Sequence, residues 1–145
     1  MGNNVSRNIQ VMGIVNLTDD SFFAGSRNLR PDGTFDEELF RGRIVNMLES
    51  GAGILDLGAC STRPGSDSIS GEEEWRRLEP ALRILAAEHE GVRVSIDTFR
   101  PEVVSRAFDI IGPFIVNDVS GGCGEMWSLL GQLGLPYIAM HTRGT

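Results

Sequence analysis

The sequence has no apolar run long enough to cross a bilayer, and it has little cysteine and little positive charge. Its longest apolar stretches are interrupted within a few residues, well short of the roughly 20 residues that a membrane-spanning helix needs. The first residues also lack the apolar stretch of a secretory signal. We therefore expect a cytoplasmic protein with no membrane partner.

The cysteine content and the net charge exclude further classes. Only two cysteines occur, Cys60 and Cys123, and no second pair could complete a disulfide framework. We expect both thiols to be free. The formal net charge of -7 argues against a nucleic-acid partner, because a phosphate backbone requires a basic face. With 145 residues, the chain is long enough for one core and too short for two ordinary domains.

Several catalytic motifs are absent as well. No Gly-x-Gly-x-x-Gly turn follows the first predicted strand, so the usual dinucleotide signature is missing. The sequence has no Gly-x-Ser-x-Gly elbow, no His-Glu-x-x-His pair and only two histidines. It therefore gives no support for a serine nucleophile or a zinc-activated water.

Short apolar segments alternate with segments of helical periodicity. Strands are predicted at residues 9–16, 92–97, 115–119 and 137–141, and in the run that begins at Ile54. This alternation predicts consecutive right-handed βαβ units around a parallel sheet.

The intervening helices are predicted from their start signals and apolar stripes. Capping boxes at Thr34 to Glu37 and at Ser70 to Glu73 mark two helix starts. Pro101 marks a third, since proline favours the first helical position. An apolar face over 126–133 indicates a fourth helix. Pro80 is expected to kink or divide the second helix.

Polar residues gather where the predicted strands end. Those residues are Asn16, Ser61, Thr62, Arg63, Asp97, Asn117, Asp118 and His141. A (β/α)8 barrel of the TIM type shows this pattern, because its active site is built from the loops after the strands. A doubly wound sheet remains the alternative fold.

The loop after Ile54-Leu-Asp-Leu has the chemistry of a phosphate site. Arg63 offers a planar fork of donors to phosphate oxygens, and the hydroxyls of Ser61 and Thr62 can complete a cradle. Pro64 and the following glycine turn the chain away. The loop therefore predicts a phosphate-bearing ligand, with a polar surface turn as the alternative.

Five short motifs, in order, resemble those of dihydropteroate synthases, the pterin-binding barrel enzymes of folate synthesis. They lie at 12–18 with 20–22, 61–65, 95–98, 115–118 and 140–144. The match covers essentially the whole chain after a segment, 1–8, that we expect to be flexible. Residues 9–145 are thus expected to form the N-terminal portion of a pterin-binding barrel, with about its first five βα units.

The resemblance implies a transferase and a sulfonamide target. It would condense 6-hydroxymethyl-7,8-dihydropterin diphosphate with p-aminobenzoate, giving 7,8-dihydropteroate and pyrophosphate, with magnesium (Mg2+) assisting the departure of pyrophosphate. The catalytic residues implied are Thr62, Arg63 and Asp97, and Asn16 would meet the metal. The substrate-binding residues implied are Ser61, Thr62, Arg63, Pro64, Asp97 and Asn117. The full-length protein would be a homodimer.

The resemblance also implies a dissociative mechanism. The bond to diphosphate loosens first, leaving a methylene cation delocalised into the pterin ring, and the arylamine then attacks. Asp97 would stabilise the positive charge, while Asp56, in mid-strand, is expected to be a structural hydrogen-bonding group.

The sequence departs from the family pattern at several positions. Asp19, Phe23 and Ala24 replace a proline, a serine and an aspartate of the first motif, and Cys60 stands where the family usually has glutamate. A complete barrel needs on the order of 250 residues, so we expect this chain alone to lack three strands and to be inactive. The alternative functions are a pterin-binding methyltransferase, which the Ser-Thr-Arg-Pro-Gly loop disfavours, and a non-catalytic pterin-binding chain.

Overall fold

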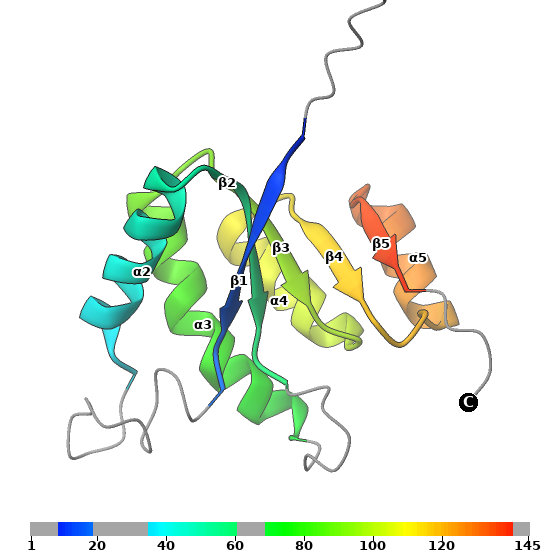
Figure 1. Ribbon diagram of the computed structural model, residues 1–145. Helices are drawn as coiled ribbons and strands as arrows, with labels where there is room; N and C mark the ends of the chain where they lie inside the picture. The colour runs from blue at the N-terminus through cyan, green and yellow to red at the C-terminus, as the bar shows by residue number, and fades with distance from the viewer. Residues whose placement is uncertain (1–8, 19–34, 61–68, 141–145) are drawn as a thin grey trace, which may run out of the picture.

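A five-stranded parallel sheet organises the molecule. The computed structural model describes residues 9–18, 35–60 and 69–140. The strands are β1 (Val11–Asn16), β2 (Ala52–Gly58), β3 (Arg93–Asp97), β4 (Ile115–Asp118) and β5 (Tyr137–Ala139). They lie in the order β1-β2-β3-β4-β5, and every neighbouring pair is parallel (Figure 1). A doubly wound sheet requires a reversal of strand order, so that alternative is wrong and the predicted barrel-type order is confirmed.

One face of the sheet is covered by helices. They are α2 (Glu37–Glu49), α3 (Gly71–Glu88), α4 (Pro101–Ile111) and α5 (Gly124–Leu133). Figure 1 shows them together behind the sheet. On β1, Val15 is buried against this layer, whereas Ile14, which points to the other face, is 64% exposed. This inner face is therefore uncovered at the edge strand β1, although Asp56 and Ser95 on the neighbouring strands are buried on it. The flexible segment expected at 1–8 lies outside the described residues.

The core lies between the sheet and the helices. Leu55 and Leu57 on β2 and Leu78 and Leu82 on α3 are fully buried. Each such side chain contributes about 1.5–3 kcal/mol relative to an exposed one. This packing stabilises the central strands and so fixes the positions of the polar residues at their ends.

The helix starts agree with the sequence prediction in part. Ser70 caps α3, with its Oγ accepting from the backbone N–H of Glu73 at 3.1 Å, and α4 begins at Pro101 as predicted. The cap predicted at Thr34 is wrong: α2 is capped by Asp36, which accepts from the N–H of Leu39 at 2.9 Å. Aspartate is as good a cap as threonine, and here it stands immediately before the helix.

Pro80 does not divide α3, which continues as one helix from Gly71 to Glu88. A proline removes one backbone hydrogen bond and costs roughly 3 kcal/mol in a helix interior. Burial of Leu78, Ala81 and Leu82 on either side of it offsets that cost, because these side chains pack against the sheet and stabilise the turns next to the proline.

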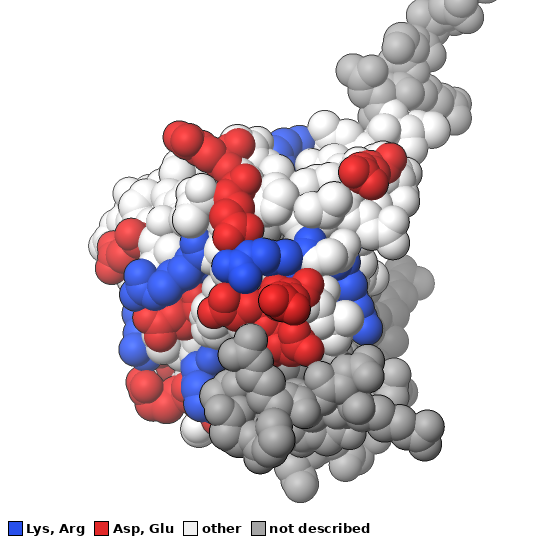
Figure 2. Space-filling model, turned by 90° about the vertical axis from the view of Figure 1, so that its left-hand side faces the viewer, with Lys and Arg blue, Asp and Glu red and all other residues white. Residues whose placement is uncertain are grey.

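Ion pairs cover the outer side of α2 and α3. Arg41 pairs with Glu37 and Glu88, and Arg83 pairs with Glu79. Figure 2 shows arginine and acidic side chains interleaved over this side of the molecule. Exposed pairs of this kind contribute about 0–1 kcal/mol each, so packing supplies most of the stability. Within the described residues, no helix has the length and apolar character needed to cross a membrane.

Candidate functional site

Three of the predicted site residues share one row across the sheet. Asn16 is the register partner of Gly58, Gly58 of Asp97, and Asp97 of Asn117. Register partners in a parallel sheet point to the same face. Asn16 and Val15 point to opposite faces, and Val15 is buried under the helices. The row therefore lies on the open inner face, at the carboxyl ends of the strands.

Gly58 leaves the middle of this row without a side chain. A Cβ atom at Gly58 would lie 3.5 Å from the Cβ of Asp97 and 3.6 Å from its Oδ2. That is ordinary van der Waals contact, so a small side chain would not clash, but it would fill the gap between Asn16 and Asp97.

Asp56 lies one row deeper and organises its neighbours. It is 6% exposed, and its Oδ1 accepts from the hydroxyl of Ser95 and from Nδ2 of Asn117, the latter at 3.3 Å. With its NH2 group turned to Asp56, the Asn117 amide directs its oxygen away from that carboxylate. Asp56 therefore has the hydrogen-bonding position expected of it, directly beneath the row.

Asp97 is surrounded by negative charge. Burial, followed by the carboxylates of Asp56, Glu74 and Asp118, raises its pKa to about 6. A carboxylate in such a setting gains from a ligand that brings hydrogen-bond donors or positive charge, because the ligand relieves both desolvation and repulsion. Perturbed carboxyl groups of this kind are common at functional sites.

A second cluster lies beside the row. Glu74 on α3 is fully buried; its Oε2 accepts from Nη1 of Arg100, whereas its Oε1 has no hydrogen-bond partner among the described residues. Arg100 also donates to the carbonyl of Ile69, and its Nη1 lies 3.6 Å from Sγ of Cys60. One guanidinium thus joins three separate parts of the chain.

Cys60 is not an activated thiol in this setting. Burial raises its pKa, and the nearby Glu74 carboxylate raises it further, against an opposing contribution from Arg100. A raised pKa keeps the group as a thiol and not a nucleophilic thiolate. Cys60 and Cys123 are both free, as expected.

The sequence analysis missed Glu74 and Arg100. A signal for Glu74 was available: it is spaced four and eight residues from Leu78 and Leu82, so helical periodicity places it on the buried face of α3. A carboxylate on such a face needs a cationic partner. Nothing in the sequence pattern identifies that partner as Arg100, which lies 26 residues away.

Several predicted positions lie outside the described residues. They are Ser61, Thr62, Arg63, Pro64, Asp19, Phe23, Ala24 and His141. The phosphate-binding role of the 61–65 loop therefore stays a prediction. The described residues on either side of it, Cys60 and Ile69, lie next to Arg100.

The predicted metal contact can be tested against the donor set. In the described ranges there is no group of three or more His, Cys, Asp or Glu side chains that could hold a metal ion. Asn16 offers one neutral oxygen at the exposed end of β1. Magnesium usually keeps several waters and binds through one or two protein oxygens plus substrate phosphates, so this sparse donor set fits magnesium carried with a diphosphate.

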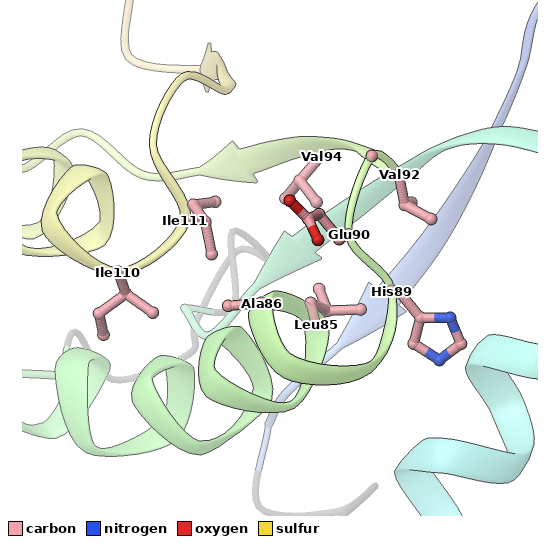
Figure 3. Close-up of a pocket in the computed structure, with 9 residues that line it drawn as sticks. Leu85, Ala86, His89, Glu90, Val92, Val94, Ile110 and Ile111 are labelled. Atoms are coloured by element: carbon pink, nitrogen blue, oxygen red, sulfur yellow. The ribbon is translucent and has the colours of Figure 1, made fainter.

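A separate cavity lies at the opposite end of the strands. It has a volume of about 230 Å³ and is bounded by the ends of α3 and α4 and the start of β3. In Figure 3, Ile110 and Ile111 lie across from Leu85 and Ala86, and the ring of His89 points away from them. Because β3 runs from this cavity toward Asp97, the cavity and the polar row are at opposite ends of the strand.

A family model, curated relatives and solved structures all indicate the same protein family for this chain. The pterin binding enzyme family matches residues 12–145. A dihydropteroate synthase of Mycobacterium leprae is 40% identical over 137 residues, which cover 93% of this chain and 45% of that protein.

Solved structures agree. A Clostridium difficile dihydropteroate synthase crystallised with pteroic acid is 32% identical, with a TM-score of 0.77, and the match covers 97% of this chain and 51% of that one. A Xanthomonas albilineans dihydropteroate synthase with 4-aminobenzoic acid is 36% identical, with a TM-score of 0.74, over 93% of this chain and 47% of that one. This chain therefore spans about half the length of these relatives.

Proposed function

The chain belongs to the pterin binding enzyme family, and from this premise we propose that it supplies the pterin- and diphosphate-facing part of a dihydropteroate synthase site. The reaction is the condensation of 6-hydroxymethyl-7,8-dihydropterin diphosphate with p-aminobenzoate to 7,8-dihydropteroate and pyrophosphate. The observation that carries the proposal is the row of Asn16, Asp97 and Asn117 on the open face of the sheet.

The pterin lies with its hydrogen-bonding edge toward Asp97 and Asn117. An amino-pyrimidinone edge presents donors and acceptors together, and a carboxylate beside a carboxamide can pair with both kinds. The hydrogen bond from Asn117 to Asp56 supports this arrangement, because it fixes which end of the amide is available. Gly58 leaves the ring room to lie close to the backbone.

The diphosphate lies toward Asn16 and residues 61–63. Thr62 and Arg63 act on the leaving group, Ser61 assists the cradle, and Pro64 forms an apolar wall for p-aminobenzoate. Asn16 would hold magnesium, and the ion, when bound, neutralises charge on the diphosphate. The position of Asn16 at the carboxyl end of β1 supports this role.

Catalysis rests on electrostatics and placement. As the carbon–oxygen bond to diphosphate loosens, positive charge spreads from the methylene into the pterin. Asp97 faces that charge, and the Asp56, Glu74 and Asp118 carboxylates that raise its pKa add to the negative potential there. Correct alignment of the arylamine supplies the remaining acceleration.

The proposal extends to the location, the oligomeric state and the inhibitors of the protein. A cytoplasmic homodimer is proposed for the full-length protein. Sulfonamides, whose aniline ring resembles that of p-aminobenzoate, would occupy the wall formed by Pro64. Competition between a sulfonamide and p-aminobenzoate tests this part.

The function is tested by NMR titration of 15N-labelled chain with pterin diphosphate and Mg2+. Binding should shift the side-chain amide signals of Asn16 and Asn117 and the backbone signal of Asp97, and Asp97→Asn should weaken binding. Shifts confined to residues around His89, at the far cavity, would contradict the proposal. Release of pyrophosphate after addition of p-aminobenzoate, measured on the full-length protein, then separates a synthase from a pterin-binding methyltransferase.

A further inference from the structure

Arg100 makes contacts at both sides of residues 61–68. One guanidinium nitrogen donates to Glu74 and lies 3.6 Å from Sγ of Cys60, and the other donates to the carbonyl of Ile69. Cys60 and Ile69 are the described residues immediately before and after that segment. Two points nine residues apart along the chain are therefore held by one planar group.

The turn that carries Arg100 is itself fixed. The backbone N–H of Arg100 donates to Oγ1 of Thr98 at 3.2 Å, and the N–H of Thr98 donates to the carbonyl of Asn117, also at 3.2 Å. The guanidinium also lies 4.6 Å from the centre of the Phe99 ring, a cation–π distance. Because Asp97 begins this turn, Arg100 ties the ends of 61–68 to the strand end that bears Asp97.

Burial makes the arrangement strong. Glu74 is fully buried, and the Arg100 side chain is 14% exposed. Removing one partner of a buried, hydrogen-bonded carboxylate–guanidinium pair leaves the other charge buried and unpaired, which is far more costly than breaking an exposed pair. On the opposite side, Nη1 of Arg77 donates to the carbonyl of Ala59 at 3.2 Å, so the end of β2 is held independently of Arg100.

We propose that Arg100 is a positioning residue, which holds Cys60 and Ile69 against the turn that follows Asp97 and so fixes the strand end that bears this carboxylate. This inference rests on the proposed function, since Asp97 belongs to the proposed pterin site. Arg100 acts through its neighbours and touches no reacting atom.

The first arm of the test is hydrogen exchange, which needs no substrate. Arg100→Ala should speed amide exchange about tenfold or more, the scale of one charged hydrogen bond, in peptides that contain Cys60 and in peptides that contain Ile69. Arg100→Lys keeps the positive charge but not the planar guanidinium, so slow exchange should be retained at Cys60 or at Ile69 but not at both. Arg106→Ala is the matched control, because Arg106 lies on α4, the helix that follows Arg100, in an exposed pair with Glu72.

The second arm is turnover with pterin diphosphate, measured on the full-length protein. Arg100→Ala should lower kcat/KM about 100-fold, the cost of a misplacement near 1 Å, and millimolar guanidinium ion should restore part of it. Arg106→Ala should change neither exchange nor turnover. A merely structural role would instead lower the melting temperature and leave kcat/KM unchanged, with no rescue.

The outcomes are separable. Faster exchange at only one of the two ends, or at neither, overturns the proposal, and so does unchanged kcat/KM in Arg100→Ala. If the unmodified protein releases no pyrophosphate, the proposed function fails, whereas faster exchange at both ends would still establish that Arg100 holds Cys60 and Ile69.

Discussion

The side-chain amide of Asn117 on β4 donates a hydrogen bond to Asp56 on β2, although β3 lies between these two strands. The distance from Nδ2 of Asn117 to Oδ1 of Asp56 is 3.3 Å. Ser95, on the intervening strand, donates to the same oxygen. Asp56→Ala should therefore leave the buried Ser95 hydroxyl and the half-buried Asn117 amide without this acceptor, at a cost of about 1–3 kcal/mol for the buried donor and less for the other. Urea unfolding would measure the loss, and pterin binding should weaken because Asn117 is no longer oriented.

Ser95→Ala is the matched control for that change. It removes one donor to Asp56 and leaves Asn117 in place, so it should lower the free energy of unfolding by less and preserve pterin binding. Equal losses of binding in both variants would show that the Asp56–Asn117 contact has no role in orienting the amide.

A second prediction concerns Asp97 and the stability of the fold. Its pKa of about 6 lies above the usual value near 3.8, so the folded state binds the proton more tightly than the unfolded state does. Stability should then fall as the pH rises from about 4 to about 6. Asp97→Asn should raise the melting temperature at pH 8, where the wild-type group is charged, and change it little at pH 4.

The same substitution should abolish turnover, because the amide cannot stabilise positive charge in the pterin. Thermal unfolding of both proteins at pH 4, 6 and 8 decides the stability part. A melting temperature that is lower in the variant at every pH would mean that Asp97 stabilises the fold and that its neighbours do not repel it.

The third prediction concerns Glu74, whose charge is one cause of the raised Asp97 pKa. Glu74→Gln removes this charge and leaves Arg100 as a nearby cation, so the pKa of Asp97 should fall below about 6. The carboxyl 13C shift of Asp97, followed as a function of pH, measures it directly. Glu72→Gln, on the same helix with a side chain 84% exposed, should leave that pKa unchanged.

Much of the fold could be predicted because it follows from local patterns. The strand that ends at Asp97 and the helix that begins at Pro101 show themselves through branched apolar residues and a proline start signal. Strand order follows from the alternation, since consecutive right-handed units place each strand beside the last. The cap of α2 was misplaced because Thr34 and Asp36 offer equivalent chemistry two residues apart.

The site could be predicted only where it lies on strands. Asn16 and Asp97 end their strands and Asn117 is the next-to-last residue of β4, so register alone brings them into one row. The contact between Glu74 and Arg100 joins two helices and a turn, and it depends on side-chain directions that no periodicity contains. Long-range pairs of this kind become visible only when the elements are packed together.

A fourth prediction concerns the link between the last two strands. The hydroxyl of Tyr137 on β5 donates to Oδ2 of Asp118 on β4 at 2.9 Å, and burial followed by this contact raises the pKa of Tyr137 to about 12. Tyr137→Phe should cost about 1.5–3 kcal/mol, the range for a hydrogen bond to a charged group. Hydrogen exchange should quicken first in β5, and an unchanged free energy of unfolding would contradict the assignment.

The last prediction distinguishes a residue that acts on the metal and diphosphate from one that acts on the pterin ring. Asn16 ends β1 on the same row as Asp97, but Gly58 lies between them, so under the proposed function we expect Asn16 to act on the diphosphate and its ion without touching the pterin edge. Asn16→Ala should weaken binding of pterin diphosphate about tenfold or more in the presence of Mg2+, as loss of one charge-assisted contact would.

Binding of the unphosphorylated pterin alcohol to the Asn16→Ala variant should be unaffected, because the alcohol carries no site for the ion. Asn117→Ala should weaken both ligands alike, since it acts on the ring. Isothermal titration of the two variants with the two ligands, with and without Mg2+, therefore resolves the roles, and an Asn16→Ala defect that persists for the alcohol would place Asn16 with the ring and not with the metal.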